Sequence, residues 1–117
     1  MVDQRGKAEA FHALHKAGEP VLLVNTWDVW SAKVVADAGF AALATSSYSV
    51  AEAAGYADGQ NIPLSEMVKI VSRIAATIPI PLTVDVEAGF SDEPAAVENA
   101  VSQIVAAGAI GIKVQFR

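Results

Sequence analysis

Residues 82–87, with the sequence Leu-Thr-Val-Asp-Val-Glu, constrain the fold more than any other segment. Their pattern predicts a strand, and because side chains alternate across a strand, the three apolar residues share one face. Thr83, Asp85 and Glu87 share the other face. A central strand of an open, doubly wound sheet is normally apolar on both faces. The pattern therefore favours a barrel-type α/β fold, in which the inner face of a strand reaches a polar mouth.

Strand and helix patterns alternate along the chain. Strands are expected at 21–24, 41–45, 82–87 and 110–116, and helices at 4–17, 29–38, 49–54, 64–78 and 93–107. The order, a helix followed by (βα)₃β, predicts parallel strands joined by right-handed crossovers. We expect the first strand to be buried and the last helix to be capped by Ser91 or Asp92. That helix should bury its valines, Val105 among them.

The chain has 117 residues, enough for one small domain. A complete (β/α)₈ barrel takes about 250 residues, so we expect residues 1–117 to form a single partial barrel domain. With 53% hydrophobic residues the chain is not disordered, and without cysteine it has no thiolate zinc site or cysteine nucleophile. The net charge of −5 argues against nucleic acid and anionic membrane as partners. We expect a cytoplasmic protein.

Polar residues follow each predicted strand at its carboxyl end. They are Asn25, Ser46 and Ser47, Asp85 and Glu87, and Gln115. In parallel α/β folds the carboxyl ends of the strands carry the functional site. Four strands with polar groups at the same end predict a site there.

The pair Asp85 and Glu87 admits two interpretations. Two carboxylates on one strand face suit a hard divalent cation such as Mg²⁺, which prefers a few carboxylate oxygens and retains several waters. Alternatively, one of them forms a structural ion pair with Lys113 on the neighbouring strand. The spacing alone leaves both interpretations open.

Four segments, taken in order, resemble the isocitrate lyase/phosphoenolpyruvate mutase superfamily of Mg²⁺-dependent enzymes. They are Asn-Thr-Trp-Asp at 25–28, Ala-Thr-Ser-Ser at 44–47 continuing to Gly-Tyr-Ala-Asp-Gly at 55–59, Pro-Leu-Thr-Val-Asp-Val-Glu-Ala-Gly-Phe at 81–90, and Ala-Gly-Ala-Ile-Gly-Ile at 107–112. The resemblance implies the N-terminal half of a (β/α)₈ TIM-type barrel, with four of its eight strands.

The resemblance also implies a metal site. Asp85 would bind Mg²⁺, or Mn²⁺ in its place, directly. Glu87 and Asp58 would hold the water ligands of the metal, and Asp85 and Asp58 are the implied catalytic residues.

The resemblance further implies a substrate site for a small α-oxo acid. Ser46, together with the backbone amides of Ser47 and Tyr48, would bind the substrate carboxylate, and Trp27 would belong to the same pocket. Members cleave or form C–C or C–P bonds of α-oxo or 2-hydroxy carboxylates next to an enolpyruvate-type fragment. The metal stabilises the enolate oxygen.

One departure from the family pattern lies after the fourth strand. The family usually has Leu-Glu-Asp there, whereas this chain has Val114-Gln115-Phe116, so Gln115 replaces a glutamate of the metal shell. We expect a family enzyme, a carbon–carbon lyase or phosphonomutase, that is inactive as this chain alone. The alternative is a non-catalytic truncated homologue or an oligomerisation module. Its expected protein partner is a second copy of the chain or a complementary half-barrel.

Overall fold

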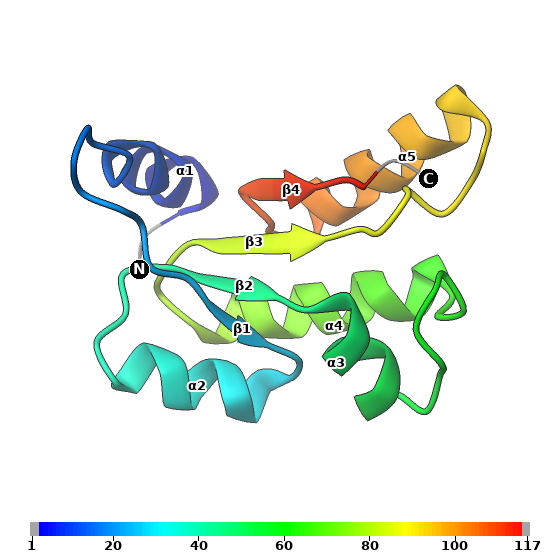
Figure 1. Cartoon of the computed structure of the whole chain (residues 1–117), viewed down its shortest axis with the longest axis horizontal. Coiled ribbons are helices and arrows are strands. Elements are labelled where there is room, and N and C mark those ends of the chain that lie inside the picture. Colours follow the sequence, from blue (N-terminus) through cyan, green and yellow to red (C-terminus); the bar gives the residue numbers. More distant parts are fainter. Residues whose placement is uncertain (1–2, 116–117) are drawn as a thin grey trace.

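The computed structural model describes residues 3–115, which form one four-stranded sheet with five helices. The strands are β1 (Val24–Thr26), β2 (Leu43–Thr45), β3 (Leu82–Asp85) and β4 (Gly111–Lys113). The helices are α1 (Gln4–Ala13), α2 (Val29–Asp37), α3 (Ser47–Ala53), α4 (Leu64–Thr77) and α5 (Pro94–Ala106). All strands are parallel and lie in the order β1-β2-β3-β4 (Figure 1). The predicted α/β class and element order are confirmed.

The long helices cover one face of the sheet. Each crossover moves to the next strand in the same direction, so right-handed crossovers place α2, α4 and α5 on the same side. Along that side α2 contacts α4 and α4 contacts α5. The core lies between these helices and the sheet and includes Leu43, Met67, Val71, Ile74, Leu82, Val84 and Ile104. The opposite face of the sheet is therefore free to carry polar groups.

Helix α4 shows why the helical side packs so well. Met67, Val71 and Ile74 recur at helical spacing, and all three are fully buried, as the sequence predicts. Pro79 follows directly after the buried Ile78 and prevents the helix from continuing. Within residues 3–115, no helix combines the length and the apolar character that crossing a membrane requires.

Helix α1 lies beside the ends at which the strands begin (Figure 1). Its Lys7 is buried, and the side-chain amine donates hydrogen bonds to the carbonyls of Ala75 at 3.2 Å and Ile78 at 2.9 Å. Gln4 donates to the carbonyls of Val105, near the end of α5, and of Ala109, beyond it. The last carbonyls of a helix have no partner in its regular hydrogen-bond pattern, so side chains of α1 supply donors at the ends of α4 and α5. Burial lowers the pKa of the Lys7 amine.

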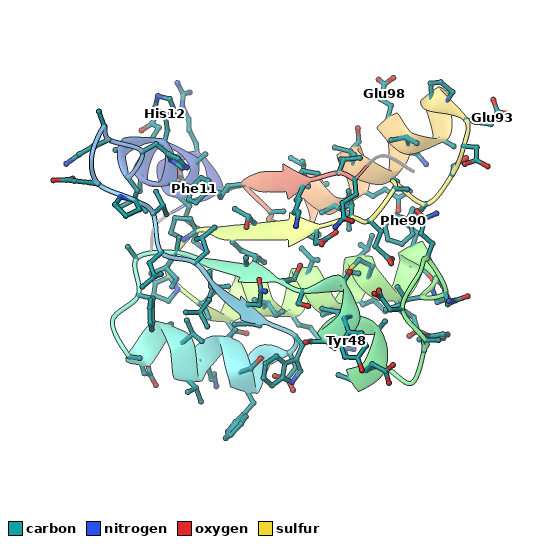
Figure 2. All side chains as sticks on the ribbon, viewed as in Figure 1. Phe11, His12, Tyr48, Phe90, Glu93 and Glu98 are labelled. Carbon is teal, nitrogen blue, oxygen red and sulfur yellow. The ribbon has the colours of Figure 1, made fainter. Side chains whose placement is uncertain are left out.

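Phe11 of α1 lies toward the beginning of the strands on the free face of the sheet (Figure 2). Gly111 lies beside it, and a Cβ there would lie only 2.7 Å from Cγ2 of Thr83. The glycine thus allows Thr83 to pack against the β4 backbone.

The first strand differs from the prediction. Residues 21–24 were expected as a buried strand, but β1 begins at Val24, where it pairs with Leu43 of β2. The preceding residues have no partner strand, so Leu22 is 72% exposed and Leu23 is 38% exposed. An apolar run alone does not distinguish a buried strand from an uncovered approach to one.

Helix α5 also differs in its cap and its buried face. Its N-cap is Glu93, without a side-chain cap bond, whereas the Ser91 hydroxyl accepts from the Glu93 N–H. The buried residues are Ala100 and Ile104, while Val105 is 42% exposed. The expected cap at Ser91 or Asp92 and the expected burial of Val105 are therefore wrong, because Ile104 rather than Val105 faces the core and the Ser91 hydroxyl binds the Glu93 N–H.

The ends of the last two strands are shorter than predicted. β3 ends at Asp85, and Glu87 adopts a left-handed backbone conformation with φ 56°. β4 ends at Lys113, and the Gln115 N–H donates to the carbonyl of Glu87. The expected continuation to residue 116 lies outside the described residues.

The contact of α1 with α4 can be tested by replacing Lys7 with methionine. The stem of the side chain is preserved, but two buried carbonyls lose their donor, so the free energy of unfolding should fall by about 1–3 kcal/mol. Urea denaturation measures this change. Lys33→Met, at an exposed position of α2, is the control and should leave stability nearly unchanged. Equal stability of both variants would show that Lys7 does not hold α1 in place.

Candidate active site

The free face of the sheet carries a hollow of about 480 Å³ lined by residues from all four strands. Asn25, Ser46, Asp85 and Lys113 contribute polar side chains to its lining. Of the polar residues predicted at the strand ends, Asn25, Ser46 and Asp85 line it, whereas Ser47, Glu87 and Gln115 do not. The hollow therefore gathers part of the expected site on the face that the helices leave free.

Asp85 is 8% exposed and closes β3. Its N–H donates to the Thr45 hydroxyl at 3.1 Å. Of its two carboxylate oxygens, Oδ1 accepts from the N–H of Glu87 at 2.8 Å, and Oδ2 accepts from the side-chain amide of Gln115 at 3.2 Å. The carboxylate is thus oriented by neutral donors on both sides.

Glu87 is 6% exposed, and its carboxylate is divided between two environments. Oε1 accepts from the backbone N–H groups of Gly59 at 3.2 Å and Gln60 at 2.9 Å. Oε2 is buried and has no hydrogen-bond partner within residues 3–115. Burying a carboxylate oxygen without a hydrogen-bond partner lowers the stability of the fold. Glu87 also has a positive φ, a strained backbone conformation that persists only where surrounding contacts hold it.

The alternative of a structural ion pair with Lys113 is not supported. Lys113 is opposite Asp85 in the β3–β4 ladder. Among the described residues, however, the ion pair that forms is Arg5–Glu9 on the surface of α1. Neither Asp85 nor Glu87 is neutralised by a cation of this part of the chain.

The loop between α3 and α4 carries Asp58. Its next two residues, Gly59 and Gln60, bind Glu87, which brings this loop against the end of β3. The Asp58 residue is exposed, and its carbonyl accepts from the side chain of Asn61. In the part of the chain that the structure describes, no three histidine, aspartate or glutamate side chains group closely enough to hold a metal. The Asp58 loop and Glu87 meet, but three carboxylates do not surround one point.

Tyr56 anchors the beginning of the same loop. Its hydroxyl donates to Oε1 of Glu66 in α4 at 2.7 Å. The hydrogen bond to Glu66, together with burial and the negative charge of that carboxylate, raises the pKa of the Tyr56 phenol. The loop that carries Asp58 is therefore attached to α4 on one side and to the β3 end on the other.

The predicted substrate residues lie in two places. Ser46 lines the hollow with Asp85 and caps α3, accepting from the Ser49 N–H at 3.4 Å. Ser47 begins α3, and Tyr48 is 61% exposed on that helix (Figure 2). Trp27 lines a different groove, of about 500 Å³, between α2, α3 and α4.

Two residues that orient the carboxylates were not predicted. Thr45 uses its hydroxyl to continue the β2–β3 ladder at Asp85, and Gln60 contacts the loop after β3. The strand pattern could have indicated Thr45, a polar residue at a strand end. Gln60 has no such signal, because its role depends on a left-handed conformation that is uncommon outside glycine.

Comparison with known proteins identifies the fold and the family. The model of the phosphoenolpyruvate phosphomutase family matches residues 11–115. An uncharacterised protein from Mycobacterium tuberculosis is 36% identical over 99 residues, which are 85% of this chain and 38% of that protein. The crystal structure of a putative phosphonomutase from Burkholderia cenocepacia superposes with a TM-score of 0.89 at 44% identity, over 92% of this chain and 44% of that one.

A third similar structure contains bound ligands. The structure of a phosphonopyruvate hydrolase in complex with oxalate and Mg²⁺ has a TM-score of 0.83 at 27% identity, over 91% of this chain and 37% of that one. The four parallel strands and their helices thus match part of the TIM-barrel-like chains of a class that includes mutases, lyases and hydrolases. The chain belongs to the phosphoenolpyruvate mutase/isocitrate lyase superfamily. It spans about two fifths of the length of these relatives.

Proposed function

We propose that this chain supplies the β1–β4 side of a divalent-cation and α-oxo-carboxylate site of the lyase and phosphonomutase type. The observation that carries the proposal is the buried pair at the end of β3, in which Oε2 of Glu87 lacks a partner within residues 3–115. Buried carboxylates are normally paired or bound to a metal. Membership of the superfamily favours a bound metal over another protein group as the partner of this carboxylate.

The donor set fits Mg²⁺, with Mn²⁺ as a substitute. Asp85 offers an oxygen in the hollow, and Glu87 offers an oxygen that no protein group of the described chain occupies. Mg²⁺ retains several waters and is held by one or two carboxylates, so a third close carboxylate is not required. Asp85 would bind the ion, while Glu87, and Asp58 from the adjacent loop, would hold its waters.

The residues of this chain would position an α-oxo acid rather than carry out the whole reaction. Ser46 would donate its hydroxyl to the substrate carboxylate, with the amides of Ser47 and Tyr48 as further donors. Trp27 lines the separate groove and has no proposed contact with the substrate in the hollow. The bound metal would supply Lewis-acid stabilisation of the enolate oxygen that develops as a C–C or C–P bond breaks. Asp58, on a loop held by Glu87 and Tyr56, is the second proposed catalytic residue, together with Asp85.

Turnover would need a second protein surface over the hollow. Asn25 and Lys113 are exposed on the free face of the sheet, so water reaches this side of the site. Stabilisation of a developing charge is strongest in a site from which water is excluded. We therefore propose that the partial barrel of residues 1–117 binds metal and ligand but does not turn over by itself.

The sheet edges favour an association role as the second candidate. Among the described residues, β1 and β4 each have a single neighbouring strand in the sheet. Large apolar residues beside these edges are exposed: Leu22, Leu23, Trp30 and Val34 near β1, and Val105 and Val114 near β4. Unpaired edges with apolar flanks invite strand pairing with another chain. A second copy of this chain, or a complementary half-barrel, would pair with the edge strands and cover the apolar residues beside them.

The binding proposal predicts that Mg²⁺ and oxalate together stabilise the chain. At a ligand concentration of about 100 times Kd, the stabilisation should approach about 2.7 kcal/mol. A thermal-melting series with Mg²⁺ alone, oxalate alone and both measures it. Asp85→Asn should abolish the joint effect, whereas Asp37→Asn, at the exposed end of α2, should keep it.

A wild-type chain whose melting temperature is unchanged by Mg²⁺ with oxalate would contradict this proposal. Gln115→Glu provides a complementary arm of the same series. It removes the amide that donates to Asp85 and adds a carboxylate, so the joint stabilisation should reach its midpoint at a lower Mg²⁺ concentration. A higher midpoint in this variant would argue against a metal beside Asp85.

The association proposal predicts an oligomer in solution, measured by light scattering after size exclusion. Leu22→Lys places a charge beside the open β1 edge and should shift the population toward the monomer. Tyr48→Lys, a comparably exposed apolar residue on α3, is the matched control. A monomeric wild-type chain would exclude this role.

A further inference from the structure

The loop after β3 and the loop between α3 and α4 bind each other reciprocally. Glu87 of the first loop accepts from the N–H groups of Gly59 and Gln60 in the second. Gln60 in turn accepts, through Oε1 of its side chain, from the N–H groups of Ala88 at 3.2 Å and Phe90 at 2.9 Å. Two side-chain oxygens thus satisfy four backbone donors, two on each loop.

The backbone of this contact is strained. Gln60, Glu87 and Phe90 have φ values of 65°, 56° and 67°, and within residues 3–115 they are the non-glycine residues with positive φ. Such conformations persist where surrounding contacts over-determine them, and they concentrate at functional sites. Each of the three residues takes part in at least one of the four hydrogen bonds between the two loops. Phe90 lies at the loop after β3 (Figure 2).

We propose that Gln60 is a positioning residue of the metal site, which holds Asp58 and orients Oε2 of Glu87 by fastening the two loops together. The inference rests on the proposed function, because it assigns Gln60 a role in the same site. Gln60 itself lies outside the lining of the hollow, so it acts through its neighbours.

The geometry links Gln60 to both carboxylates. Asp58 is two residues before Gln60, so fixing the Gln60 backbone fixes the loop position of Asp58. The Gln60 N–H occupies Oε1 of Glu87, which leaves Oε2 as the free, buried oxygen. Without the Gln60 side chain the Ala88 and Phe90 N–H groups lose their acceptor, and the backbone that follows Glu87 loses its constraint.

Asn61 provides a natural contrast within the same loop. Its side-chain amide also makes two hydrogen bonds, but it donates them to the carbonyls of Ala57 and Asp58. These bonds stay within one loop and do not reach the segment after β3. Asn61→Ala therefore removes the same number of amide hydrogen bonds without separating the loops.

The test is Gln60→Gly in the whole chain, because glycine adopts positive φ freely and the variant loses only the side-chain contacts. Calorimetric titration of oxalate in the presence of Mg²⁺ is the main readout. Loss of a contact that orients a metal ligand typically weakens metal affinity by about 10- to 100-fold, and we expect the affinity for oxalate in the presence of Mg²⁺ to fall by a factor in this range. Gln60→Glu keeps an oxygen acceptor for both N–H groups and should recover most of the affinity. Asn61→Ala leaves the contact between the loops intact and should lose much less affinity than Gln60→Gly.

Amide hydrogen exchange supplies the second readout. In Gln60→Gly the Ala88 and Phe90 N–H groups should exchange faster, whereas in Asn61→Ala they should remain protected. If the wild type binds Mg²⁺ and oxalate and Gln60→Gly binds them equally well, the positioning role is overturned and the proposed function stands. If the wild type binds neither, the proposed function fails first, and the positioning role fails with it.

Discussion

The hydrogen bonds that Glu87 accepts from Gly59 and Gln60 are the contact on which the site depends. They bury a carboxylate without neutralising it, since both donors are backbone N–H groups. The carboxylate has one oxygen, Oε2, without a partner among the described residues. A cation, or a water molecule bound to it, would supply the partner that this buried oxygen lacks.

The asymmetry of the sheet makes this placement possible. The helices cover one face, where Leu82 and Val84 of β3 are fully buried in the core. The other face is left for Asp85 and for the hollow at the carboxyl ends of the strands. On this face Thr45 supplies a hydroxyl where the backbone ladder between β2 and β3 ends. Packing of β3 against the helices on one face of the sheet thus holds the strand in place, with its polar end on the other face.

The periodic features of the fold were predictable from the sequence. The two-residue period at 82–85 indicated a strand with one apolar face, and the helical spacing of Met67, Val71 and Ile74 indicated α4. The exposed Leu22 was not predictable, because its burial depends on a neighbouring strand rather than on local pattern. The role of Lys7 was not predictable either, because its partners are carbonyls 68 and 71 residues away.

The sequence pattern singles out the polar residues Asp85 and Glu87 near the end of β3, but not the geometry that joins them to the neighbouring loop. Strand alternation placed Asp85 and Glu87 on one face, but the chain leaves the strand before Glu87, and a left-handed turn brings its carboxylate to the Gly59 N–H. A positive φ at a single non-glycine residue leaves no periodic pattern in the sequence from which it could be predicted. The reciprocal contact of Gln60 becomes visible only when both loops are seen together.

The most direct test of the central claim is an anomalous-scattering map from crystals of the chain grown with Mn²⁺ and oxalate. The account predicts a single strong peak next to the Asp85 carboxylate and on the side of Glu87 that carries Oε2. It also predicts oxalate in the hollow beside Ser46. A map without a peak at this position, or with Mn²⁺ only at surface carboxylates elsewhere, would contradict the claim that the end of β3 is a divalent-cation site.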